Sequence, residues 1–276
     1  MRRPAEGPPA FPAPPGKRPG GAGAKDVSPR RLEMCGRGSQ RPAKGISRRL
    51  EYLPAMCGRF VQTPIKAQGS FAYPELVGDL LAMPSSYNLA PTQRASVLLD
   101  SGTGLQLTRL SWGLLPFWAK AKGLQGSTIN ARIETVATKP AFRAAFKKRR
   151  CLVPMAGYYE WSVNAEDGKK DPWFIHASEP LWAAGLWEDT SPLLDADNLG
   201  SFTVITGDSS GVSADIHDRM PVWLGLDLAE AWITADSDDA MSMLLASEPP
   251  DMEAYRVSRA VNSPRNNRDD LLQAVA

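Results

Sequence analysis

The composition of the chain changes abruptly at Met56, and this change limits which part can form a packed core. Residues 1–55 contain 10 Pro and 8 Gly and show no hydrophobic periodicity. Such a segment cannot bury enough apolar surface to offset the conformational entropy that is lost on folding. We therefore expect residues 1–55 to be a disordered leader, and residues 56–276 to form a single globular domain.

The net charge of +2 averages two segments of opposite sign. Residues 1–55 hold 12 Lys and Arg against 4 Asp and Glu, whereas residues 57–276 hold 20 against 26. Basic residues still cluster within the acidic domain, at Lys139, Arg143, Lys147, Lys148, Arg149 and Arg150. A locally basic face is compatible with nucleic-acid binding but does not require it. The run at 147–150 is more simply explained as a solvated helix end, with a DNA-facing ridge as the alternative.

Several classes of protein are disfavoured by the cysteine, histidine and hydropathy patterns. The three cysteines lack the paired spacing of a disulfide framework or a zinc site, and two histidines are too few for a multi-histidine metal centre. No run of about 18 apolar residues predicts a membrane span, and no apolar segment of a secretory signal follows the basic N-terminus. We expect a cytoplasmic protein without a metal or another cofactor. His176 and Cys151 are interpreted as satisfied interior residues.

Short apolar or alternating runs dominate after Met56, and they outnumber the helical patterns. Strands are expected at Arg59–Gln62, Ala95–Leu99, Leu105–Leu110, Cys151–Pro154, Tyr158–Val163, Trp173–Ile175, Trp182–Leu186, Phe202–Thr206, Val222–Leu224 and Tyr255–Val257. Helices are expected at Pro74–Ala82, Ile133–Lys148, Leu228–Thr234, Ser237–Ala246 and Arg268–Val275. Residues 102–104, Gly-Thr-Gly, are expected to form a hairpin turn. The pattern predicts an α+β fold, built on a curled, mostly antiparallel β-sheet or barrel with peripheral helices.

Cys57 is the first candidate for chemistry. If translation begins at Met56, removal of that methionine leaves Cys57 with a free α-amine and a thiol, whose reference pKa values are about 8 and about 8.5. The amine can condense with an aldehyde to an imine, and the thiol can then close a five-membered thiazolidine. The simpler alternative for a lone cysteine is a small buried hydrophobe in a first strand.

Seven motifs in order resemble the SOS response-associated peptidase (SRAP) family over residues 56 to about 267. They are Met56-Cys57-Gly58-Arg59-Phe60, Tyr87-Asn88-Leu89-Ala90-Pro91-Thr92, Trp112-Gly113-Leu114-Leu115-Pro116-Phe117-Trp118, Ile129-Asn130-Ala131-Arg132-Ile133-Glu134-Thr135, Cys151-Leu152-Val153-Pro154 running into Gly157-Tyr158-Tyr159-Glu160-Trp161, Asp215-Ile216-His217-Asp218-Arg219-Met220-Pro221 and Val257-Ser258-Arg259-Ala260-Val261-Asn262. The resemblance implies an enzyme of the DNA damage response that acts on abasic sites in single-stranded DNA. It would shield the lesion as a covalent DNA–protein crosslink, as a monomer that associates with the nucleoid when bound to DNA.

The same resemblance implies roles for four catalytic residues. Cys57 matches the crosslinking residue, and Asn130 matches the amide that holds the cysteine backbone and amine in place. Glu160 matches the general acid and base in ring opening and imine formation, and His217 matches a proton-transfer partner at the sugar oxygen. The chemistry also needs groups of these types, because a carboxyl beside aromatic rings and a histidine both exchange protons near neutral pH. Taken alone, Glu160 is more simply explained as an outward strand residue and His217 as part of a salt-bridged loop.

Four further residues are expected to contact DNA. Arg59 and Arg132 match phosphate-binding arginines of the family, and guanidinium groups suit phosphates. Trp118 matches an aromatic that stacks beside the lesion, and Phe117 beside it can fill the gap left by a missing base. Trp112 and Trp161 are interpreted as core residues.

The leader is a departure from the family pattern, in which the cysteine is the first residue of the mature protein. We expect translation to begin at Met56; the alternatives are cleavage by the domain itself or by another protease, or an inactive chain. Met34-Cys35-Gly36-Arg37-Gly38 copies the opening motif without a following strand, so we interpret it as a decoy. Two other functions stay open: a cysteine peptidase that uses Cys57, His217 and an acid such as Glu160, and a non-covalent single-stranded DNA-binding module.

Overall fold

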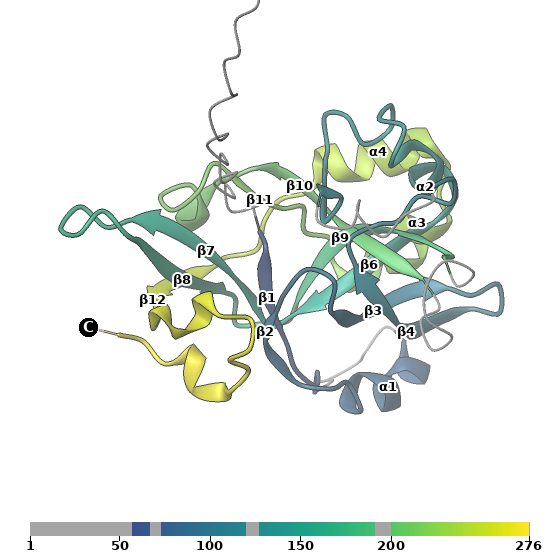
Figure 1. Ribbon diagram of the computed structural model, residues 1–276. Coiled ribbons are helices and arrows are strands. Elements are labelled where there is room, and N and C mark those ends of the chain that lie inside the picture. The colour runs from purple at the N-terminus through teal and green to yellow at the C-terminus, as the bar shows by residue number, and fades with distance from the viewer. Residues whose placement is uncertain (1–56, 67–72, 120–126, 191–199, 276) are drawn as a thin grey trace, which may run out of the picture. The chain divides into compact units, whose positions relative to one another are not determined.

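The structure, a computed structural model, describes residues 57–66, 73–119, 127–190 and 200–275, which belong to one compact unit, Glu51–Ala276 (Figure 1). The expected disorder of residues 1–55 and the copied motif at Met34 lie outside the described residues.

Five strands of this unit form a closed ring. They are β3 (Arg94–Asp100), β4 (Leu105–Trp112), β6 (Arg150–Met155), β9 (Leu181–Glu188) and β10 (Ser201–Asp208). The ring closes because β9 pairs with both β6 and β10, while β10 also pairs with β4. Within the ring only the β10–β4 pairing is parallel. This arrangement confirms the predicted curled, mostly antiparallel barrel.

Alternating side chains along the ring separate two hydrophobic cores. Val97 and Val153 belong to one core, whereas their neighbours Leu98 and Leu152 belong to the other. The period of two along a strand places successive side chains on opposite faces of the sheet. Residues 102–104 connect β3 and β4 as predicted, and Gly102 and Gly104 adopt positive φ values of 88° and 124° that favour glycine.

A second sheet carries Glu160 on one of its strands and has Cys57 immediately before another. Its order is β12 (Glu253–Arg256), β8 (Lys170–His176), β7 (Gly157–Val163), β1 (Arg59–Gln62) and β2 (Ser86–Leu89). All of its pairings are antiparallel. Gly157 permits close packing here, because a Cβ atom at this position would lie only 2.5 Å from the Phe174 ring. Strands far apart in sequence therefore meet at β1.

Short helices lie beside the barrel, as predicted. They are α1 (Val77–Leu81), preceded by the 3-10 turn Pro74–Leu76, then α2 (Arg143–Lys148), α3 (Ala229–Thr234) and α4 (Ser237–Ala246). In Figure 1, α2, α3 and α4 gather beside β6 and β9, where their apolar residues join the core that contains Leu98 and Leu152. Asp236 caps α4 by accepting hydrogen bonds from the amides of Asp238 and Asp239, both at 2.9 Å.

Three of the predicted elements differ from those observed. The helix predicted over Ile133–Lys148 begins only at Arg143, because residues 133–142 form turns and the Ile133 amide donates to Thr206. The strand predicted at Val222–Leu224 lies earlier, as β11 (Arg219–Pro221). The C-terminal helix predicted from Arg268 is reduced to the 3-10 turn Asp269–Leu272. In addition, β2 and β5 (Asn130–Arg132) were not expected.

Candidate active site

Cys57 lies in a buried position immediately before β1. Its side chain has no exposed surface, and its φ of +42° is unusual for a residue other than glycine. Pairing of Arg59 and Phe60 with Tyr159 and Tyr158 holds the start of β1 against β7. The backbone nitrogen of Cys57 then donates a hydrogen bond to the Glu160 carboxylate. The structure thus brings together two predicted site residues that are 103 positions apart.

Glu160 is a buried carboxyl on β7, with only 3% of its surface exposed. Burial raises its pKa to about 8, although the hydrogen bond from Cys57 opposes this shift. A carboxyl with such a pKa exchanges a proton near neutral pH and is suited to general acid–base chemistry. Its burial rules out the outward strand position that the sequence alone left open.

The environment of the Cys57 thiol also disfavours charge. Burial raises the pKa of this thiol well above its usual value, and the nearby Glu160 carboxylate raises it further. Tyr158 lies two residues before Glu160 on β7 and forms a 2.7 Å hydrogen bond with the Ser213 hydroxyl. Burial raises the pKa of Tyr158 as well, so its phenol remains neutral. The thiol therefore sits in surroundings that favour its neutral form.

His217 precedes β11 and shares electrostatic neighbours with Glu160. Asp218 raises the pKa of both side chains, and Lys170 lowers both. Burial is the largest effect on His217 and lowers its pKa, which favours neutral imidazole. In this form Nδ1 accepts the Arg219 amide hydrogen at 3.1 Å. The same nitrogen lies 2.9 Å from Asp218 Oδ1, and the two residues form an ion pair only when the imidazole ring is protonated.

Arg219 links two of the motifs and was missed by the sequence reasoning. Its buried guanidinium donates to the Glu134 carboxylate, to Asp208 at 2.6 Å and to the Thr206 carbonyl at 2.7 Å. This network joins the turn after β5 to the strand that follows His217. Arg219 and Glu134 each lie in one of the family motifs, but nothing in the sequence indicates that they form a pair.

Asn130 and Arg132 are the two ends of β5, which runs parallel to β10. Asn130 is partly buried, and Arg132 is exposed. Exposure leaves the Arg132 guanidinium accessible to a phosphate. Contact between Asn130 and Cys57 stays a prediction.

Arg59 is held by the C-terminal part of the chain. Its Nη1 donates to the Asn88 side-chain oxygen at 2.9 Å and to the Val261 carbonyl at 2.8 Å, and its Nη2 reaches the Asn262 carbonyl at 3.3 Å. Asn88 is buried, and its amide nitrogen lies 2.8–3.0 Å from the carbonyls of residues 261, 263 and 266. Asn88 is thus a further residue that orients Arg59; in the sequence it stood out only as part of a motif.

Two aromatic side chains are exposed where the chain leaves the barrel. Phe117 and Trp118 have 63% and 51% of their surface exposed, after the buried Leu114, Leu115 and Pro116. Exposed rings of this kind can stack on nucleobases. Trp112 is fully buried, as expected, whereas Trp161 is only partly buried and donates to the Asn262 side chain at 2.7 Å.

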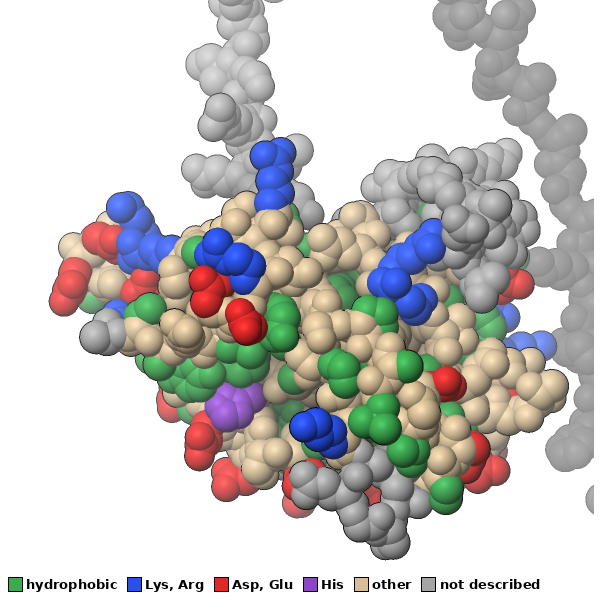
Figure 2. All heavy atoms as spheres, turned by 90° about the horizontal axis from the view of Figure 1, so that it is seen from below, with side chains coloured by type: hydrophobic (Ala, Val, Ile, Leu, Met, Phe, Trp, Pro, Cys, Tyr) green, Lys and Arg blue, Asp and Glu red, His purple; other side chains and the backbone are tan. Residues whose placement is uncertain are grey.

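The predicted solvated helix end at 147–150 is wrong for its last two residues. Arg150 is 2% exposed, and its guanidinium donates to the carbonyls of Trp232, at 2.6 Å, and Ala235. Arg149 pairs with Glu188 at 2.7 Å. Both charges therefore serve the fold, since the carbonyls at the end of α3 need donors. On the face seen from below, Lys and Arg side chains lie in separate groups with hydrophobic and acidic side chains between them (Figure 2).

The two residues that were expected to be interior, Cys151 and His176, differ in how deeply they are buried. Cys151 is fully buried, which confirms the prediction. His176 is only partly buried, and its ring stacks on Phe174 with 5.3 Å between centroids. It is thus a residue of the sheet surface.

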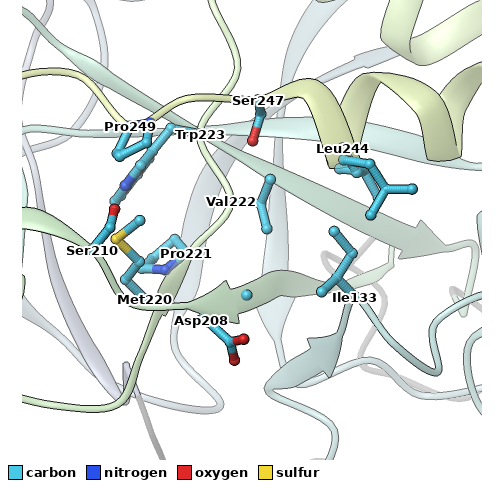
Figure 3. A pocket seen from close by; sticks show the side chains of 12 residues that line it. Ile133, Asp208, Ser210, Met220, Pro221, Val222, Trp223, Leu244, Ser247 and Pro249 are labelled. Carbon is cyan, nitrogen blue, oxygen red and sulfur yellow. The ribbon is translucent and has the colours of Figure 1, made fainter. Parts of the chain in front are cut away.

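A cavity of about 210 Å³ lies beside β11 (Figure 3). Its walls are mainly apolar and include Ile133, Met220, Val222 and Leu244. Such walls offer few donors for a phosphate. Within the described residues, no three His, Cys, Asp or Glu side chains are grouped as a metal site, and no helix is long and apolar enough to span a membrane.

Comparisons with known proteins agree with this arrangement of motifs. The chain is 41% identical over 194 residues to the abasic site processing protein YoaM of Bacillus subtilis, covering 68% of this chain and 85% of the relative. It is 30% identical over 230 residues to the abasic site processing protein YedK of Escherichia coli, covering 80% and 100%. It is also 30% identical over 232 residues to the abasic site processing protein HMCES of Xenopus tropicalis, covering 72% and 68%.

Solved structures share the fold. A phage-related protein from Bordetella bronchiseptica aligns with a TM-score of 0.57 at 28% identity, covering 74% of this chain and 95% of that one. A protein from Bacteroides thetaiotaomicron aligns with a TM-score of 0.60 at 24% identity, covering 80% and 100%. The model of the family described as SOS response associated peptidase (SRAP) matches residues 56–264. The chain therefore belongs to the SRAP family.

Proposed function

We propose that this protein recognises abasic sites in single-stranded DNA and crosslinks them through Cys57. One observation carries the proposal: the Cys57 nitrogen donates to a buried carboxyl, Glu160, whose pKa is about 8. The reacting nitrogen must lose protons, and the aldehyde oxygen must gain them. A group that accepts and donates protons near neutral pH is therefore suited to this position. The names of the relatives, abasic site processing proteins, agree with this substrate.

The proposed reaction joins the opened sugar of the lesion to both nucleophiles of Cys57. The amine attacks the aldehyde carbon, and the carbonyl oxygen takes up a proton. Loss of one water gives an imine; the thiol sulfur then bonds to the same carbon while its proton passes to nitrogen, which closes the thiazolidine. Glu160 exchanges protons with nitrogen and oxygen, Asn130 orients the amine, and His217 serves the sugar oxygen in formation and reversal.

This reaction requires a free amine on Cys57. The peptide bond from Met56 to Cys57 is therefore absent in the active protein, either because Met56 is the first residue and is removed or because the leader is cleaved. Cleavage by the domain itself would be the peptidase activity in the family's name. The protein then acts as a monomer that associates with the nucleoid through DNA.

DNA would be held by exposed aromatic and basic side chains. The exposed Phe117 and Trp118 would stack on bases or fill the gap at the lesion, and Arg132 would bind phosphate. Arg59 is partly committed to carbonyls of the C-terminal segment. It would accordingly contribute a fixed positive charge more than a mobile one.

The test uses protein that begins at Cys57, mixed with single-stranded DNA containing one abasic site and analysed on a denaturing gel. We expect an adduct from the parent protein and from Cys151→Ala, a control that removes another buried thiol. Cys57→Ala should give none, and Glu160→Gln and His217→Ala should slow formation or reversal. Acetylation of the N-terminus should also prevent the adduct; adducts that persist in acetylated protein, or in all three variants, would refute the mechanism.

A further inference from the structure

A polar pocket lies at the end of β1 that is far from Cys57. Its volume is about 230 Å³, and its lining includes Gln62, Ser85, Arg94, Arg109 and Asn267. Gln62 is the last residue of β1, five positions after Cys57. At about 3.3 Å per strand residue, the pocket lies roughly 17 Å along the strand from the candidate active site.

Strand register places the two arginines of this pocket on one face of the barrel. Arg94 pairs with Ser111 and Ser96 pairs with Arg109 across β3 and β4. Directly paired residues, and residues two apart on one strand, point to the same side of a sheet. The Arg109 guanidinium also donates to the Arg94 carbonyl at 3.3 Å. Both side chains thus approach the same cavity.

Within the described chain, no acidic side chain neutralises the two arginines of this pocket. No acidic residue lines it, and neither Arg94 nor Arg109 has an ion pair among the described residues. Arg149, Arg219 and Arg259, in contrast, each pair with a carboxylate. Two neighbouring guanidinium groups repel each other, and an anion between them removes that repulsion.

Of the remaining polar groups of the pocket, Gln62 is fully engaged and forms a fixed floor, whereas Asn267 has a donor left. The buried Gln62 donates to the carbonyls of Ser96 and Pro154, both at 2.9 Å, and its oxygen accepts the Ser96 amide at 2.7 Å. The side-chain oxygen of Asn267 accepts the Tyr87 amide at 2.6 Å, which leaves its NH₂ group as a donor. A fixed floor, two cations and a neutral donor suit an oxyanion.

We propose that this pocket binds a phosphate group, and that this phosphate belongs to the DNA strand flanking the abasic site. The inference rests on the proposed function for its choice of ligand. A stacked strand advances about 3.4 Å per nucleotide, so a distance of roughly 17 Å corresponds to about five nucleotides from the lesion. The pocket would fix the direction in which the flanking strand leaves Cys57.

The test measures equilibrium DNA binding against salt concentration in a Cys57→Ala background, where no crosslink forms. The double variant Arg94→Gln/Arg109→Gln is compared with this parent and with Lys169→Gln, an exposed control on the β7–β8 turn. One phosphate contact contributes about 0.7 to the slope of log affinity against log salt for a single strand. We expect the double variant to lose about this amount with DNA carrying about ten nucleotides on each side of the lesion, and the control to lose none.

Shorter DNA and free phosphate distinguish the sources of the ligand. With about two nucleotides on each side, the strand cannot reach the pocket, and the double variant should bind as the parent does. An unchanged slope on long DNA would overturn the inference; if inorganic pyrophosphate then still bound the parent but not the double variant, the pocket would serve a free phosphate compound. Crosslinking by the protein with intact Cys57 is measured in parallel. If no crosslink forms, the proposed function is refuted, while the slope of log affinity against log salt still tests the pocket separately.

Discussion

Because Glu160 is a buried carboxyl, we predict that the free energy of unfolding depends strongly on pH. The pKa of Glu160 is about 8 in the folded protein against 4.5 for the ordinary side chain. Because the folded pKa is raised, the associated stability is fully present below pH 4.5 and is lost as the pH rises through 8. One pKa unit corresponds to 1.36 kcal/mol, so the whole loss is about 5 kcal/mol, of which about 3.5 kcal/mol falls between pH 5 and 8.

The perturbation that isolates this effect is Glu160→Gln, which keeps the shape of the side chain and removes its titration. Urea unfolding of the parent and the variant, followed by tryptophan fluorescence from pH 5 to 9, gives the free energy of unfolding at each pH. The parent should lose about 3.5 kcal/mol relative to the variant between pH 5 and 8, whereas the exposed control Glu75→Gln should follow the parent. The reasoning would be refuted if the difference in free energy of unfolding between parent and variant did not change with pH, or if the parent became more stable relative to the variant as the pH rises.

Three other substitutions test the remaining contacts. Arg150→Met should reduce the free energy of unfolding by about 2–4 kcal/mol in urea, since it leaves the Trp232 carbonyl and its neighbours without a donor. Asn88→Ala should cost about 2–3 kcal/mol in the same assay, because it leaves the Val261 carbonyl with fewer donors. Trp118→Ala should change stability by less than about 0.5 kcal/mol but weaken single-stranded DNA binding, measured by fluorescence anisotropy, by about 1–3 kcal/mol.

The parts of the fold that local signals define could be predicted from the sequence. β1 and α4 begin and end at the expected residues. For α4 the reason is a local one, since Asp236 supplies its own cap to amides two and three residues later. Alternation along β3 and β6 also separates the two cores without any knowledge of the partners.

The missed elements depend on distant partners. β2 and β5 are short and polar, and they become strands because β1 and β10 offer them hydrogen bonds. Residues 133–142 have the apolar spacing of a helix, but the Ile133 amide is committed to Thr206, which lies outside any local pattern. For the same reason the sequence could suggest Cys57 and Glu160 as candidates but could not show that the nitrogen of one meets the carboxyl of the other.

The electrostatics of the site also bear on which nucleophile reacts first. A cysteine peptidase relies on a thiolate beside an imidazolium, which requires the thiol pKa to fall and the histidine pKa to remain high. Here burial raises the pKa of the Cys57 thiol and lowers that of His217, so both shifts oppose such a pair. An amine has no comparable need for prior ionisation of sulfur, because its lone pair attacks once a neighbouring group accepts its proton. For the proposed crosslink, the environment of Glu160 and Cys57 therefore favours an order in which nitrogen would attack first and the neutral thiol would react only with the imine.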